Sequence, residues 1–149
     1  MRHRPHNGLP RWLRRSLYLL TCVLLASGLA WLAVAYLLAP AGEETPAPHA
    51  LAGPLLAAHG IAAYSALVVC GLVGHVHLRT GWRVGAMRVA GVVLGLLLVA
   101  LALSGLGFYY VGNEAATPWL RWAHVAAGMA LPGALGWHIV RGRRVGGHG

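Results

Sequence analysis

Histidines within apolar stretches are the residues of this chain whose type and spacing could do chemistry. His124 and His138 lie fourteen residues apart in the stretch 119–144, WLRWAHVAAGMALPGALGWHIVRGRR. In an α-helix, fourteen residues rise about 21 Å and return to within about 40° of the starting direction. The two imidazoles would share one helix face, near opposite sides of a hydrocarbon layer about 30 Å thick. Imidazole within lipid is costly and usually functional, so each ring needs a partner.

A second apolar stretch, at about 50–79, offers matching histidines near its start and its end. Two helices that each carry one histidine per leaflet predict two stacked haems, each with two axial imidazoles. His59 and His124 would bind the haem on the external side. His138 and a histidine at the end of the second stretch would bind the haem on the cytoplasmic side. Six-coordinate iron of this kind suits one-electron transfer rather than oxygen activation.

The fourth ligand has two candidates, His75 and His77. His77 is eighteen residues from His59, which is about five whole turns, whereas His75 is rotated by about 160° from His59. Depth gives the opposite indication, because the rise from His59 is about 27 Å to His77 and about 24 Å to His75, against about 21 Å in the other helix. A tilt of the helix can compensate for a few ångströms of difference in rise, whereas a half-turn rotation would point the imidazole away from its haem. His77 is therefore the expected ligand, and His75 is the alternative.

The composition indicates a membrane protein. Of 149 residues, 58% are hydrophobic and 10% are charged, with twelve basic and three acidic side chains. Such a chain is too apolar for a soluble domain of this size. The net charge of +9 would suggest nucleic acid in a soluble protein. Here the arginines flank apolar runs, so we expect contact with membrane lipid and no nucleic-acid partner.

The apolar runs predict an all-α integral membrane protein, a four-transmembrane-helix bundle that forms a single membrane domain over residues 1–149. Arginines cluster before the first run, after the second and after the fourth, so the positive-inside rule places both termini in the cytoplasm. The first run exceeds twenty residues, too long for a signal-peptide core. The helices are expected at approximately 12–39, 50–78, 84–110 and 118–141.

Glycines and arginines could support the haems. Gly91 and Gly105 are also fourteen residues apart, so they could give clearance to porphyrins at the spacing of the histidines; close helix packing is the alternative. Cys22 and Cys70 form no CxxC or CxxCH pattern, which argues against covalent haem attachment. Several arginines could pair with haem propionates, although topology explains them equally well: Arg79, Arg83 and Arg141 on the cytoplasmic side, and Arg121 on the external side.

Four motifs are distinctive: LLAAHG at 55–60, HLRTGW at 77–82, SGLGFYYVGNE at 104–114, and WxHxxxGxxLPxxxxxH followed by GRR within 122–144. They resemble those of small four-helix b-type cytochromes, the cytochrome b561-like and bacterial membrane cytochrome b proteins. The resemblance covers about residues 50–144 and implies two non-covalent haems b between the second and fourth helices of a protein in the bacterial inner (cytoplasmic) membrane. It also favours His77. The first helix has no histidine, unlike relatives that place a ligand there, so no role carries over to it.

The expected function is transmembrane electron transfer through two bis-histidine haem b groups, by a stand-alone cytochrome or by the membrane subunit of an oxidoreductase. A redox partner protein or quinone would exchange the electrons. The sequence offers no acid–base constellation for bond-breaking chemistry, so an electron-transfer component is expected rather than a complete enzyme. One alternative is a haem-free transporter or proton-relay protein that uses the intramembrane histidines. Another is a structural subunit in which the histidines only bridge helices.

Overall fold

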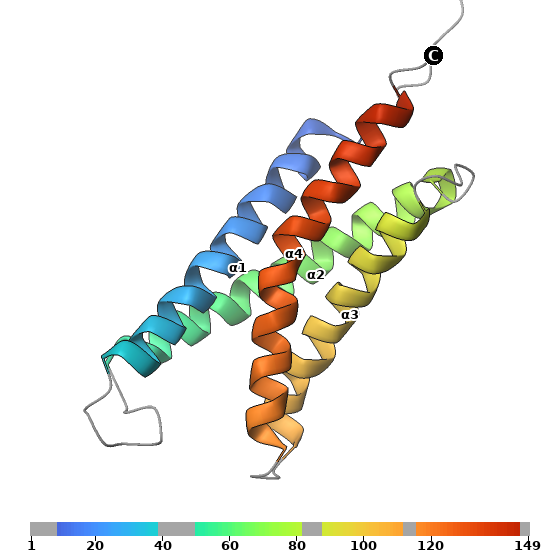
Figure 1. Cartoon of the computed structure of the whole chain (residues 1–149). Coiled ribbons are helices and arrows are strands. Elements are labelled where there is room, and N and C mark those ends of the chain that lie inside the picture. Colours follow the sequence, from blue (N-terminus) through green and yellow to red (C-terminus); the bar gives the residue numbers. More distant parts are fainter. Residues whose placement is uncertain (1–8, 39–49, 82–87, 112–115, 147–149) are drawn as a thin grey trace, which may run out of the picture. The chain divides into compact units, whose positions relative to one another are not determined.

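The computed structural model describes residues 9–38, 50–81, 88–111 and 116–146. Within these residues the protein is all-helical, which confirms the predicted class (Figure 1). The ends of the second and fourth helices continue past the expected residues 78 and 141. Apolar periodicity marks the part of a helix that can lie in lipid, whereas backbone hydrogen bonding continues into polar sequence. The helices are α1 (Arg11–Leu37), α2 (Ala52–Gly81), α3 (Arg88–Tyr110) and α4 (Thr117–Gly146).

Three of these helices are long and apolar enough to cross a membrane: Arg11–Leu37, Ala52–Gly74 within α2, and Val89–Tyr110 within α3. They indicate a multi-pass membrane protein. Their large apolar side chains are widely exposed, as lipid-facing side chains must be; Leu19 and Leu96 are 65% and 64% exposed. In α4, histidines, arginines and an internal proline, Pro132, interrupt the apolar sequence. A span at α4 and cytoplasmic termini therefore stay predictions.

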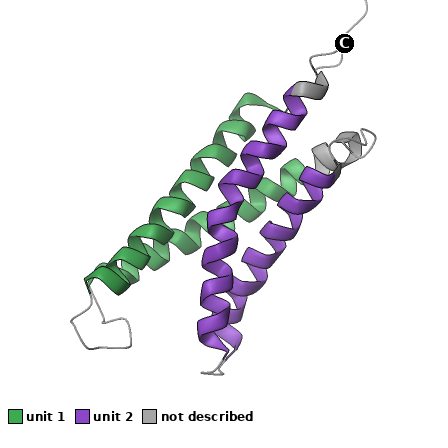
Figure 2. Ribbon diagram, in the orientation of Figure 1, with its two compact units in different colours: residues 1–79 green, residues 80–149 purple. Residues whose placement is uncertain are grey.

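The chain divides into two compact units, residues 1–79 and residues 80–149, shown in green and purple in Figure 2. The first unit holds α1 and most of α2, and the second holds α3 and α4. Each unit is thus built around a helical hairpin. The single membrane domain expected over residues 1–149 stays a prediction.

The hairpin of the second unit has a regular antiparallel register. Gly105 of α3 faces His124 of α4, and Gly91 of α3 faces His138. The fourteen residues from Gly105 back to Gly91 in α3 therefore span the same length as the fourteen residues from His124 on to His138 in α4. Small residues permit this close approach, and Ala90 next to Gly91 is completely buried.

Aromatic side chains gather where the second hairpin turns. Tyr109 and Tyr110 end α3, and Trp119 and Trp122 lie in the first two turns of α4. All four are exposed. Tyr and Trp side chains in such positions are typical of a membrane–water interface, because one part of each ring system is apolar and another can hydrogen bond to water. This end of the hairpin is therefore suited to the surface of a bilayer.

Candidate histidine site

The ring of His124 is held against α3 by a serine and a glycine. The hydroxyl oxygen of Ser104 lies 2.7 Å from Nδ1 of His124. A Cβ added at the adjacent Gly105 would lie 3.7 Å from Cε1 of the same ring. The ring of Phe108, one turn further along α3, meets the imidazole edge-on, with centroids 5.6 Å apart and an interplanar angle of 65°. α3 therefore fixes both the position and the tilt of this imidazole.

The first hairpin holds His59 in the same way. The hydroxyl oxygen of Ser27 in α1 lies 2.9 Å from Nδ1 of His59 in α2. A Cβ added at Gly28 would lie only 3.3 Å from Cε1 of the ring. Each hairpin thus presents a Ser-Gly pair on its first helix to a histidine on its second.

The single proton of each serine hydroxyl decides which ring nitrogen carries a proton. The Ser104 hydroxyl oxygen is 2.6 Å from the carbonyl oxygen of Ala100, and that of Ser27 is 2.7 Å from the carbonyl oxygen of Val23. Oxygens approach this closely only with a proton between them, and a carbonyl has none to give. Each serine therefore donates to its own helix, and its oxygen accepts the Nδ1–H of the histidine.

The neutral tautomer that results is the one that a metal needs. With the proton on Nδ1, the lone pair of the imidazole is on Nε2. Histidines that bind metals in proteins nearly always donate the other ring N–H to an acceptor that fixes tautomer and orientation. The donor set of His59 and His124 therefore fits an axial role at a haem iron.

His138 has a different neighbourhood at the other end of the second hairpin. A Cβ added at Gly91 would lie 3.8 Å from Cε1 of His138, and the Nδ1 atom of His138 is buried. The residue before this glycine is Ala90, whereas the residue before Gly105 is Ser104. His124 and His138 thus each lie beside a glycine of α3. A serine precedes the glycine beside His124, whereas an alanine precedes the glycine beside His138.

The glycines make room for imidazole rings. Gly28, Gly91 and Gly105 all lie within van der Waals distance of a histidine Cε1 when a Cβ is added. Sequence spacing put Gly91 and Gly105 on a face with the period of the histidines, and these contacts give that spacing a physical basis. Clearance of a porphyrin by the same glycines stays a prediction.

The remaining expected site residues are less informative. The side chains of His75, His77 and Arg79 lie outside the described residues, as does all of Arg83. Arg141 places its guanidinium 5.2 Å from the ring centroid of Trp137, a cation–π contact one turn away on α4. Arg121 is partly exposed near the start of α4. Propionate pairing by any of the four arginines, Arg79, Arg83, Arg121 and Arg141, stays a prediction.

A metal site built from three or more protein side chains has little support in the part of the chain that the structure describes. There, no three His, Cys, Asp or Glu side chains gather into a cluster that could hold a metal ion. An iron with two axial imidazoles takes only two ligands from the protein, and each pair expected here joins one unit to the other. The pairing of His59 with His124, and of His77 with His138, therefore stays a prediction. Cys22 and Cys70 are free thiols.

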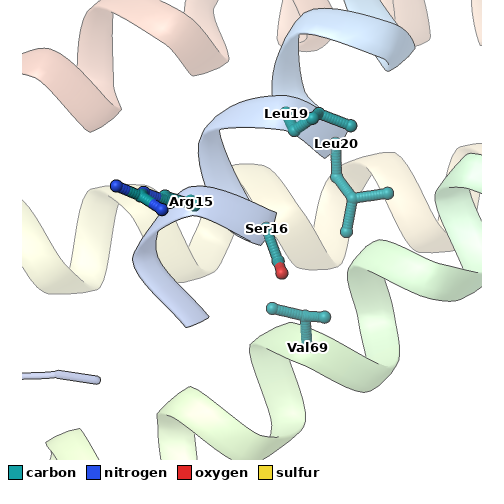
Figure 3. Close-up of a pocket in the computed structure, with 5 residues that line it drawn as sticks. All are labelled: Arg15, Ser16, Leu19, Leu20 and Val69. Carbon is teal, nitrogen blue, oxygen red and sulfur yellow. The ribbon is translucent and has the colours of Figure 1, made fainter. Parts of the chain in front are cut away.

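The first hairpin also has a shallow hollow that is separate from the histidines (Figure 3). Its lining is mainly apolar, with Leu19 and Leu20 from α1 and Val69 from α2. The Ser16 hydroxyl, which points toward Val69 in Figure 3, donates to the Trp12 carbonyl oxygen at 3.0 Å. Arg15 completes the lining. The hollow lies at the end of α1 where arginines are frequent.

Sequence reasoning overlooked the two serines, because attention went to histidines and to glycine spacing. A signal was present: the triplet Ser-Gly-Leu occurs in the first apolar run at 27–29 and again in the third at 104–106. In both hairpins this triplet precedes the helix that carries the histidine. A repeat of three common residues is weak alone, and the contacts with His59 and His124 give it meaning.

Comparison of the chain with protein families, with curated proteins and with solved structures gives no match.

Proposed function

We propose that this protein transfers electrons across a membrane through two non-covalent haems b, each with two axial histidines. The observation that carries the proposal is the matched anchoring of His59 and His124. Two different hairpins each use a buried serine oxygen and a glycine to hold an imidazole in the tautomer that keeps a lone pair on Nε2. An arrangement of this kind is expected of a metal ligand.

In this proposal His59 and His124 hold the external haem, and His138 holds the cytoplasmic haem with His77. His75 is the alternative to His77. Bound haem would supply a one-electron Fe(III)/Fe(II) couple. The protein contributes the axial imidazoles and a water-poor apolar surrounding. With two histidines of the chain holding each haem, the iron would be closed to oxygen and to substrates.

The proposed setting is the cytoplasmic membrane of a bacterium, with α4 as a fourth span and both termini in the cytoplasm. Histidines at two depths would let an electron cross between a partner on one side and a partner on the other. A redox protein or quinone is the proposed partner. The chain would then act alone as a cytochrome or as the membrane subunit of an oxidoreductase.

A haem-free proton relay is less well supported by the contacts. A relay needs groups that can both accept a proton and pass it on. The hydroxyl protons of Ser27 and Ser104 point to carbonyl oxygens of Val23 and Ala100, and a backbone carbonyl does not pass a proton along. These hydrogen bonds suit fixed orientation of a ring better than movement of a proton.

An absorption spectrum with haem quantification tests the proposal. The full-length protein, produced in haem-replete cells and purified in detergent, should show a low-spin b-type spectrum and approach two haems per chain by pyridine haemochrome analysis. The variant His3→Ala, changed in the N-terminal tail, is the matched control and should keep this content. A wild-type protein that is helical by circular dichroism and contains no haem would rule out the proposed function.

A further inference from the structure

We infer that Ser27 and Ser104 are positioning residues that set the electronic character of the external histidine pair. They lower the reduction potential of the haem held by His59 and His124, and leave the cytoplasmic haem unaffected. The inference rests on the proposed function. It names a role for α1, to which neither the histidines nor the resemblance assigned one.

The first support is the equivalence of the two serines. Ser27 and Ser104 are 9% and 7% exposed, and few other side chains among the described residues are buried to this degree. Each lies within 3.2 Å of the carbonyl oxygen three residues earlier, as well as closer to the one four residues earlier. The hydroxyl proton is therefore held toward the helix backbone in both cases. Water has little access to compete for the oxygen.

The second support is chemical direction. A ring N–H that donates to a fixed acceptor makes the opposite nitrogen a stronger electron donor to a metal. Stronger axial donation stabilises ferric iron more than ferrous iron, so it lowers the potential. His59 and His124 both donate Nδ1–H to a serine oxygen. If they hold one iron, as the proposed function has it, the two effects would add at that iron.

The third support is the contrast within the second hairpin. Fourteen residues separate Ser104 from Ala90, just as fourteen separate His124 from His138. The register of α3 and α4 therefore places Ala90 at the cytoplasmic level where Ser104 stands at the external level. A methyl group cannot accept an N–H. Among the described residues, the serine contribution is thus confined to the external pair.

Redox titration of serine variants tests the role. In Ser27→Ala and Ser104→Ala, we expect the external centre to shift to a more positive potential, with a larger shift in the double variant. The cytoplasmic centre should not move. Ser65→Ala is the matched control, because the Ser65 hydroxyl donates to the Ile61 carbonyl oxygen at 2.9 Å from an exposed position of α2. Ser104→Thr keeps a hydroxyl and should restore most of the wild-type potential.

Two results of the titration would overturn the inference: unchanged potentials in a double variant that keeps both haems, or an equal shift in Ser65→Ala. Selective loss of the external haem would support it, because an imidazole without its serine is held less firmly. A purely structural role predicts loss of both haems together with helix content, and no spectral change at one centre alone.

A measurement on haem-free protein separates this inference from the proposed function. Full-length protein labelled with ¹⁵N-histidine should show His59 and His124 protonated at Nδ1, and Ser104→Ala should shift His124 toward a mixture of tautomers. Protonation at Nε2 in the wild type would overturn the inference even if two haems bind. Absence of haem from the wild type would instead remove the proposed function, while Nδ1 protonation would still support the serine assignment.

Discussion

The hydroxyl oxygen of Ser104 in α3 accepts a hydrogen bond from Nδ1 of His124 in α4, at 2.7 Å. The same relationship recurs between Ser27 and His59 in the other hairpin, at 2.9 Å. A single Ser–His contact between helices would be ordinary helix packing. Two of them, each beside a glycine that contacts the same ring, indicate that the positions of the rings matter for more than packing.

Ligand removal should separate the two haems. Under the proposed function, His124→Ala would remove an axial imidazole from the external haem, and His138→Ala would remove one from the cytoplasmic haem. Each variant should lose about one of two haems, or convert one centre to high spin, since the other site lies about 20 Å away along the helix. Pyridine haemochrome analysis with electron paramagnetic resonance measures both effects. Loss of both haems from either variant, with helix content intact, would contradict two independent sites.

The end of α2 offers a choice between two histidines. If rotation about the helix axis determines the ligand, His77→Ala loses the cytoplasmic haem and His75→Ala keeps a normal low-spin spectrum. If depth determines it, the two outcomes exchange. We expect His77, because a half-turn error would direct an imidazole away from its iron. A two-haem spectrum in His77→Ala would show His75 to be the ligand and would leave His59, His124 and His138 unaffected.

Topology can be tested with reporters in the two connections that the distribution of arginines places outside. Thr45 and Ala115, which both lie outside the described residues, should report the external side. A fusion after Arg144 should report the cytoplasm, because α4 is predicted to span and to end in basic sequence. An external signal after Arg144 would show that α4 does not cross the membrane as proposed.

The helices could be predicted from sequence because hydrophobic runs of sufficient length leave few other structures. Spacing alone placed Gly91 and Gly105 on one face with the period of His124 and His138, and the structure shows that Gly105 faces His124. Contacts of Ser27 and Ser104 did not follow, because a serine in an apolar helix commonly bonds to its own backbone. Only coordinates show that the same oxygen also meets an imidazole on the next helix.

The limits of periodicity are visible at the helix ends. Arg79, Thr80 and Gly81 continue α2 beyond the apolar run, since a helix end in water can satisfy its carbonyls with solvent. Sequence periodicity also cannot predict which histidines bind the same haem. Spacing gives the depth of a histidine in the membrane, and it does not give the helix that the histidine faces. The sequence therefore predicts the pairing of His59 with His124 only from their similar depth.

The glycines beside the histidines give a graded prediction. A Cβ at Gly28 would lie 3.3 Å from Cε1 of His59, tighter than ordinary contact, whereas a Cβ at Gly105 would lie 3.7 Å from Cε1 of His124. Gly28→Ala should therefore push the His59 ring from its place, with about 1–3 kcal/mol of overpacking strain, and broaden or shift the spectrum of the external haem. Gly105→Ala should fit with little change.

Gly60→Ala is the matched control, because nothing lies within 4 Å of a Cβ at Gly60, directly after His59 in the chain. Haem content and the low-spin spectrum should follow the order of contact distances, with Gly28→Ala most affected and Gly60→Ala unchanged. Gly105→Leu extends the series, since a branched side chain cannot avoid the His124 ring, and it should reduce the external haem as His124→Ala does. Equal spectra for Gly28→Ala and Gly60→Ala would mean that the His59 ring does not occupy the space beside Gly28 in the functional protein.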